Sequence, residues 1–227
     1  MRNILLSAFI ACAIGQMAHS AEPATAAKAA AEEPIPKTTP WNDPNLQGLW
    51  GPAFVQSLGE DAPMLPENYK RYKSLENADD PIDSCIPPGV PRVMNLAFPF
   101  EILQTPKVVY ILLEYDQTTR RIYLNSKHPP DPDPTWLGHS IGWWEGKTLV
   151  VETIGQNPDT WLDMRGHLHS DKMKLIERFT RSDDGKSLTY QIIIDDPTMY
   201  SKPWGLTKTH QLRPDMTINE FICESVR

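Results

Sequence analysis

Short hydrophobic runs recur along the second part of the chain, and each is followed by a cluster of turn residues. Runs of this length, rich in Val, Ile, Leu, Tyr and Thr and bounded by Gly, Pro, Asp and Ser, predict β-strands. The predicted strands are Phe98–Gln104, Val108–Tyr115, Arg121–Asn125, His139–Trp144, Thr148–Ile154, Lys172–Arg181, Ser187–Asp195, Lys208–Leu212 and Ile218–Glu224. Because the connections are tight, we expect neighbouring strands to pair antiparallel in a meander.

A single sheet of this many strands tends to curl and close on itself. We therefore expect a mainly β fold, a calycin- or lipocalin-like barrel or curved half-barrel, with a two-sheet sandwich as the alternative. The stretch from Trp41 to Pro91 is rich in Pro, Asp and Asn and predicts an irregular covering segment. Within it, Pro66–Glu76 predicts one short helix, because Pro66 suits the first helical turn.

The N-terminus predicts a secretory signal peptide over residues 1–20. Arg2 precedes an apolar run from Ile4 to Ile14, and small residues at positions 18 and 20 frame a cleavage site. The apolar run is too short to cross a bilayer, so we expect a periplasmic or secreted protein without membrane insertion. Residues 21–40, mainly Ala, Pro, Glu and Lys, predict a disordered leader, and residues 41–227 predict a single barrel-like domain.

Cleavage would change both the charge and the cysteine count. Loss of Arg2 leaves 21 basic against 29 acidic residues, a formal net charge of -8, which argues against a nucleic-acid or anionic-membrane partner. Loss of Cys12 leaves Cys85 and Cys223, an even pair in an oxidising compartment. We expect these two residues to form a disulfide; the alternative is two buried free thiols.

Four motifs resemble those of a large, mostly uncharacterised family of exported bacterial proteins. They are Cys85-Ile-Pro-Pro-Gly-Val-Pro-Arg92, Pro99-Phe-Glu-Ile-Leu-Gln-Thr-Pro106, Gly138-His-Ser-Ile-Gly-Trp-Trp-Glu-Gly-Lys-Thr-Leu-Val-Val-Glu-Thr153 and Phe221-Ile-Cys-Glu224. The resemblance runs from about Asp43 to the C-terminus. This chain departs from the family in having Trp143 where relatives usually carry Arg, and Lys147 where they carry Asp. The resemblance implies export and paired cysteines, and it implies no particular activity.

The third motif contains the G-x-S-x-G pattern of a hydrolase nucleophile elbow at Gly138–Gly142. That elbow requires a strand before the serine and a helix after it, whereas another predicted strand follows here. A serine hydrolase is therefore not our main hypothesis. His139, Ile141 and Trp143 share one face of the predicted strand, which places an imidazole beside apolar side chains.

Glu177 is the sharpest candidate for acid-base chemistry. It shares one strand face with Met173, Leu175 and Phe179, so its carboxylate is expected to point inward. Desolvation disfavours the charged form of such a group and raises its pKa toward the range useful for general acid or base catalysis.

Two further carboxylates occupy similar positions. Glu114 ends the row that contains Tyr110, and Glu101 lies between apolar residues of the preceding run. The alternative for any of these carboxylates is an ion pair that ties strands together. The candidate partners are Arg92, Arg120 and Arg165.

The segment Trp161–Ser170 holds the densest group of polar side chains. If it is extended, His167 and His169 face the same way, and His139 or Glu177 would complete a metal site. The alternatives are a satisfied structural network, or Asp163 paired to His169 or His139 so that it fixes the imidazole tautomer for a proton transfer.

Aromatic residues flank these polar candidates, as expected around a small apolar or aromatic ligand, although they also fill ordinary cores. We therefore consider three functions: a cofactor-independent acid-base enzyme of lyase, isomerase or hydrolytic type, a lipocalin-like binding protein, and a structural domain with a filled core. The catalytic candidates are His139, Glu177, Asp163 and His169. The ligand-binding candidates are Glu101, Tyr110, Glu114, Trp136, Trp143 and Trp161. No cofactor is expected, with a metal ion as the alternative, and the sequence predicts no oligomeric state.

Overall fold

The computed structural model describes residues 35–59, 61–76 and 79–224. The described residues belong to one compact unit that begins at Ile35. The predicted signal peptide and residues 21–34 of the predicted leader lie outside this range. Residues 35–40, also assigned to the leader, already make contacts in the domain, since the backbone N–H of Asn45 donates to the carbonyl of Lys37 at 3.0 Å. Within the described ranges, no helix has the length and apolar character needed to cross a membrane.

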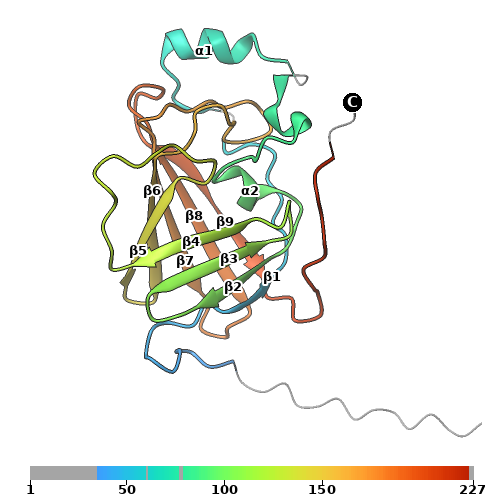
Figure 1. Cartoon of the computed structure of the whole chain (residues 1–227), viewed down its shortest axis with the longest axis vertical. Helices are drawn as coiled ribbons and strands as arrows, with labels where there is room; N and C mark the ends of the chain where they lie inside the picture. Colours follow the sequence, from blue (N-terminus) through green and yellow to red (C-terminus); the bar gives the residue numbers. More distant parts are fainter. Residues whose placement is uncertain (1–34, 60, 77–78, 225–227) are drawn as a thin grey trace, which may run out of the picture. The chain divides into compact units, whose positions relative to one another are not determined.

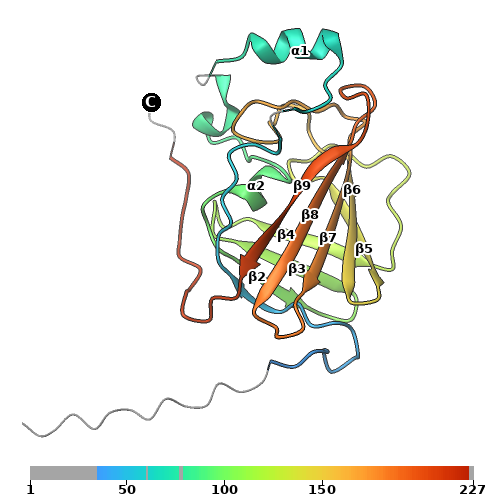
Figure 2. The same ribbon diagram turned by 180° about the vertical axis from the view of Figure 1, so that it is seen from behind.

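Nine strands follow one another around a single sheet that curves into a nearly closed barrel (Figures 1 and 2). They are β1 (Gly48–Trp50), β2 (Phe100–Gln104), β3 (Val108–Leu113), β4 (Thr119–Leu124), β5 (His139–Glu145), β6 (Thr148–Ile154), β7 (Lys174–Arg181), β8 (Ser187–Asp195) and β9 (Trp204–Gln211). Two backbone hydrogen bonds of 2.8 Å join the ends of β1 and β9, from Gly51 to Gln211 and from Arg213 to Leu49. The predicted barrel is confirmed.

The predicted strands need three corrections, one of them an added strand. β1 lies within the segment expected to be irregular, and β9 begins at Trp204, four residues before the prediction. Residues 218–224 form no strand; Phe221 makes a single parallel bridge to Tyr115 instead. The C-terminal segment is held by a disulfide between Cys85 and Cys223, with 5.6 Å between their Cα atoms, as the cysteine count predicted.

β4 and β5 pair in parallel, whereas every other pair in the sheet is antiparallel. The predicted meander is therefore wrong at this point. The 14-residue connection from Asn125 to Gly138, rich in Pro and Asp, carries the chain back to the end of the sheet from which β4 started. The parallel pairing covers only Ile122–Leu124 with Ser140–Gly142.

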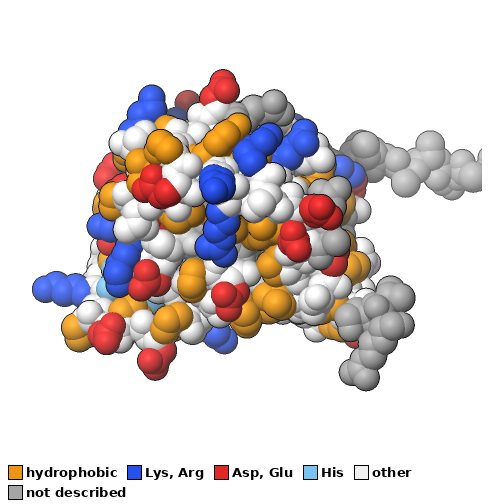
Figure 3. Space-filling model, turned by 90° about the horizontal axis from the view of Figure 1, so that it is seen from above, with side chains coloured by type: hydrophobic (Ala, Val, Ile, Leu, Met, Phe, Trp, Pro, Cys, Tyr) orange, Lys and Arg blue, Asp and Glu red, His pale blue; other side chains and the backbone are white. Residues whose placement is uncertain are grey.

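The helices gather at one end of the barrel (Figure 1). α1 (Pro66–Lys73) confirms the predicted helix and has Pro66 in its first turn, while η2 (Pro81–Ser84) and the buried α2 (Arg92–Asn95) were not predicted. Figure 3 looks onto this end, where basic, acidic and hydrophobic side chains are interspersed over the surface.

The barrel interior is mainly apolar. Buried apolar side chains from α2 and from all strands except β5 and β9 fill it, including Trp50, Phe100, Ile111, Ile122, Leu149, Phe179, Leu188 and Met94. A few polar side chains lie among them, and these are the ones that need partners.

Candidate functional site

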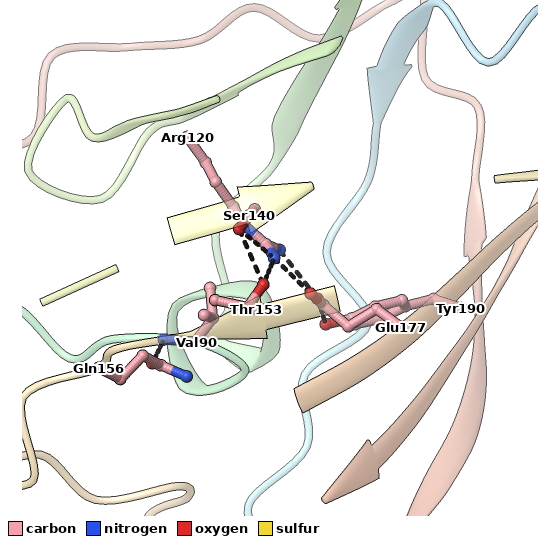
Figure 4. Close-up of polar contacts among 7 residues, drawn as sticks. All are labelled: Val90, Arg120, Ser140, Thr153, Gln156, Glu177 and Tyr190. Atoms are coloured by element: carbon pink, nitrogen blue, oxygen red, sulfur yellow. Dashed lines mark hydrogen bonds and ion pairs between the residues drawn. The ribbon is translucent and has the colours of Figure 1, made fainter. Parts of the chain in front are cut away.

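A buried ion pair links Arg120 of β4 to Glu177 of β7 across the barrel interior (Figure 4). Nη1 of Arg120 donates to Oε1 of Glu177 at 2.8 Å, and Nη2 donates to Oε2. The hydroxyl of Tyr190 donates to the same Oε1 at 2.5 Å. Nη2 of Arg120 also donates to Oγ1 of Thr153 at 2.9 Å and to Oγ of Ser140 at 3.2 Å, and these two hydroxyls lie 2.8 Å apart.

Glu177 therefore points inward, as predicted, and has taken one of the arginine partners named as the alternative. Burial opposes a charged guanidinium, yet the adjacent Glu177 raises the pKa of Arg120 above its ordinary value. Burial, followed by the charge of Glu177, raises the pKa of Tyr190 well above the value for a free phenol. Arg120 stays charged and Tyr190 stays protonated near neutral pH, so this network ties β4, β7 and β8 together.

The wall of the barrel opens where β4 runs past the start of β5. Because the pairing begins at Ile122, residues 119–121 have no paired residue in β5. A pocket of about 350 Å³, within the usual size range of small-molecule sites, lies at this gap. We call it the seam pocket; Thr119–Arg121, Tyr123 and Thr135–Ser140 line it.

The surface of the seam pocket is mostly apolar, with polar groups at its buried end. Tyr123 and Trp136 line it together with His139, which stacks on the Tyr123 ring at a centroid distance of 5.3 Å. Arg120 and Ser140, only 1% and 2% exposed, belong to the interior network and also line the pocket. A ligand here would contact aromatic rings on one side and the edge of the ion-pair network on the other.

The catalytic candidate His139 was predicted to share one strand face with Ile141 and Trp143, and this face proves to be the outer one and not the barrel interior. Ser140 points inward to Arg120, and successive side chains of a strand point to opposite faces, so His139 lies on the outer face of the sheet. There, Nδ1 of His139 lies 2.8 Å from Nδ1 of His128, in the connection between β4 and β5. Nε2 of His128 in turn lies 3.4 Å from Oε1 of Glu152 on β6, and Glu152 is paired with Lys174 at 3.2 Å.

These contacts favour one arrangement of the protons on the two imidazoles. A carboxylate only accepts, so its negative charge favours a proton on the facing Nε2 of His128, although the two atoms, 3.4 Å apart, form no hydrogen bond. Neutral His128 then has a bare Nδ1, which accepts from Nδ1–H of His139. Nε2 of His139 is left with a lone pair, and no hydrogen bond to it is formed within the described part of the chain.

Burial favours the neutral form of both imidazoles. It lowers the pKa of His139 below 6.5. It also lowers the pKa of His128, where the neighbouring His139 acts in the same direction and Glu152 opposes it. Near neutral pH the pair therefore consists of two neutral rings, and His139 has the protonation state of a general base.

The polar segment near α1 forms a separate cluster. Asp163 pairs with His167, Nδ1 to Oδ2 at 2.7 Å, and not with His169 or His139 as expected. Burial disfavours the charged carboxylate, but the hydrogen bond from His167 and the backbone N–H of Leu58 lower the pKa of Asp163 overall. Nε2 of His169 lies 2.9 Å from the hydroxyl of Thr160, so the four catalytic candidates do not share one site.

The proposed metal site is not assembled from these histidines, because His167 and His169 take different partners. No group of three potential ligands from His, Cys, Asp and Glu occurs in residues 35–59, 61–76 and 79–224. The G-x-S-x-G segment lies in a strand, where Ser140 is 2% exposed and bonded to Thr153 and Arg120. It therefore forms no nucleophile elbow.

Of the ligand-binding candidates, only Trp136 lines the seam pocket. Glu101, Tyr110 and Trp143 lie half-buried on the outer face of the sheet, one residue out of phase with the inward positions. Glu114 is buried just beyond β3 and accepts from the backbone N–H of Asn219 at 2.8 Å. Trp161 lies near α1 and lines a different pocket of about 270 Å³.

Sequence reasoning missed His128 and Glu152. His128 precedes a Pro-Pro-Asp-Pro-Asp-Pro run, which reads as a turn, and Glu152 ends a hydrophobic run like many surface residues. The available signal was the register between β5 and β6, which pairs Glu152 with Ile141, two residues after His139.

No protein-family model matches this chain, and no curated protein matches it either. The function is therefore inferred from the residues themselves.

Proposed function

We propose that this is an exported protein that binds a small apolar or aromatic molecule in the seam pocket and takes a proton from it through Nε2 of His139. The observation that carries the proposal is the row of Glu152, His128 and His139, whose last member lines a pocket with aromatic walls and has its Nδ1 engaged by His128. The reaction class is proton abstraction by a lyase or isomerase without a redox cofactor. The disulfide between Cys85 and Cys223 is compatible with export.

The neighbours of His139 can stabilise its protonated form. When Nε2 of His139 takes a proton, the ring becomes an imidazolium whose Nδ1–H donates to His128. His128 is in turn polarised by the carboxylate of Glu152, which stabilises the positive charge. At the buried end of the pocket, the charge of Arg120 is balanced by Glu177, but its Nε is a buried donor without a hydrogen-bond partner among the described residues.

The test uses 5-nitrobenzisoxazole, a small aromatic carbon acid that reports on any base in an apolar pocket. The base removes the proton from C3, the C–H electron pair forms the nitrile, and the N–O bond breaks to release a coloured phenolate. We expect saturable turnover above that of free imidazole. The rate should rise with pH below 6.5 and level off near neutral pH, because burial lowers the pKa of His139.

Substitutions separate the roles of the residues. His139→Gln should abolish turnover, while Glu152→Gln should lower the rate by about 10- to 100-fold, since it removes an outer partner of the base. Glu145→Gln makes the same chemical change at an exposed carboxylate paired with Arg178, and it should leave the rate unchanged. Turnover that survives His139→Gln would contradict the proposal.

The second candidate is a lipocalin-like binding protein that uses the same pocket without catalysis. It is favoured by the stacking of His139 on Tyr123, which makes the imidazole part of an aromatic wall. A panel of small aromatic compounds distinguishes the two functions. Saturable binding that is retained in His139→Gln, with no proton exchange at any bound carbon acid, would support the binding protein.

A further inference from the structure

Arg181, the last residue of β7, is a buried cation without a carboxylate partner among the described residues. It is 8% exposed. Its Nε donates to the carbonyl of Gly185 at 2.7 Å, and its Nη1 donates to the carbonyls of Asn45 and Gln47 at 3.2 and 3.0 Å. Burial lowers the pKa of Arg181, which is the expected result of desolvation without a neighbouring negative charge.

The guanidinium is held in a fixed orientation with one nitrogen unused. The three backbone acceptors occupy Nε and Nη1, and the guanidinium carbon lies 5.0 Å from the centre of the Trp50 ring. Nη2 has no hydrogen-bond partner in the described ranges, and it is not one of the buried nitrogens that solvent cannot reach. Arg181 is thus pre-organised to donate to an acceptor that comes from outside the domain.

A pocket of about 160 Å³ lies beside Arg181, at the end of the barrel opposite α1 (Figure 1). Lys37 and Lys147 contribute two more positive charges to its lining, and Asp183 contributes one negative charge, which is paired with Lys147 at 2.8 Å on the exposed rim. Most of the exposed pocket surface is apolar, and its lining includes Ile35, Pro36 and Pro44, with the fully buried Leu46 behind them. The pocket therefore combines a buried cation with apolar walls and has less than half the volume of the seam pocket.

We propose that this pocket binds a small monocarboxylate with a short apolar chain. The carboxylate accepts from Nη2 of Arg181 and is attracted by Lys37, and the chain packs against Ile35 and the prolines. A bare inorganic oxyanion would satisfy the charge but would leave the apolar walls exposed to water. This site is independent of the proton-transfer function proposed for the seam pocket, since the two pockets share no residue.

The experiment titrates the mature protein with sodium butyrate, butyramide and sodium sulfate at constant ionic strength and follows heat of binding and thermal midpoint. Butyramide has nearly the same shape as butyrate without the charge, and sulfate has charge without the apolar chain. We expect saturable binding and a rising midpoint with butyrate alone. No saturable butyrate binding, or equal binding of butyramide or sulfate, would overturn the proposal.

A pair of charge reversals locates the site. Lys37→Glu should weaken butyrate binding by about tenfold or more, because it removes an attractive charge and adds a repulsive one. Lys202→Glu makes the same change at an exposed lysine in the connection between β8 and β9, and it should leave the affinity unchanged. If the two substitutions weaken binding equally, the cause is the net charge of the protein and not a local contact, and the site is refuted. Arg181→Lys, if folded, should abolish saturable binding, because it removes the fork of donors.

Discussion

Replacement of Glu177 by Gln should destabilise the barrel strongly. The carboxylate of Glu177 is 0% exposed and accepts from both terminal nitrogens of Arg120 and from Tyr190. An amide at this position keeps one acceptor and turns a donor toward the guanidinium, so Arg120 becomes an uncompensated buried charge. Breaking a buried ion pair in this way costs about 3 to 5 kcal/mol.

The loss should be visible as a lower thermal midpoint. For a domain of this size, about 2 to 4 °C accompanies each kcal/mol, so the midpoint should fall by about 6 to 20 °C. Chemical denaturation followed by circular dichroism measures the same free energy of unfolding directly. Asp215→Asn, at the exposed pair between Arg213 and Asp215, serves as a control and should leave stability unchanged.

A double substitution tests whether the buried charge is the cause. Adding Arg120→Met to Glu177→Gln removes the guanidinium, leaves an amide oxygen for Tyr190, and leaves Ser140 and Thr153 bonded to each other. The double variant should therefore recover most of the stability lost by the single one. A single variant that loses less than about 1 kcal/mol, or a double variant no more stable than the single, would refute this reasoning.

Two further predictions concern pH and redox state. Burial, followed by the nearby Lys208, lowers the pKa of His210 to about 4, so the unfolded chain binds a proton first as the pH falls from 6.5 toward 4. The contribution of His210 to the free energy of unfolding is therefore fully present above pH 6.5, and up to about 3 kcal/mol of it is lost as the pH falls through this window. His210→Gln should make the free energy of unfolding less dependent on pH in this range. Unfolding curves at several pH values that show the same pH dependence in both proteins would contradict the prediction. The disulfide between Cys85 and Cys223 spans 138 residues, so Cys85→Ser with Cys223→Ser should lower the free energy of unfolding by up to about 4 to 5 kcal/mol. Thiol titration of the unfolded, unreduced mature protein should find no free thiol, and two reactive thiols would disprove the pairing.

The sequence by itself determined the elements whose two faces differ. In β7, Leu175, Glu177 and Phe179 lie on one face, and Lys174, Ile176 and Arg178 lie on the other. Because Lys174 belongs in solvent, the face with Glu177 points into the barrel. The position of Glu177 therefore followed from a period of two residues. The disulfide followed from an even count of cysteines after the predicted signal cleavage, because only one pairing remained.

Tertiary structure decided which side chains point into the barrel in strands whose two faces the sequence does not distinguish. β3 reads Val-Val-Tyr-Ile-Leu-Leu, so alternation gives no preference, and Tyr110 proved to lie outside. In β5, the interior side holds Ser140 and Gly142. Arg120 needs the hydroxyl of Ser140, and a Cβ at position 142 would lie 2.8 Å from a methyl carbon of Ile122.

Only the fold brought the members of the candidate site together. His128, His139 and Glu152 come from a Pro-rich connection and two strands, and they meet because that connection returns β5 to a parallel position beside β4. The same short parallel pairing leaves the start of β4 uncovered and forms the seam pocket. Neither the parallel return nor the gap leaves a local pattern in the sequence, because both depend on contacts between segments that are distant along the chain.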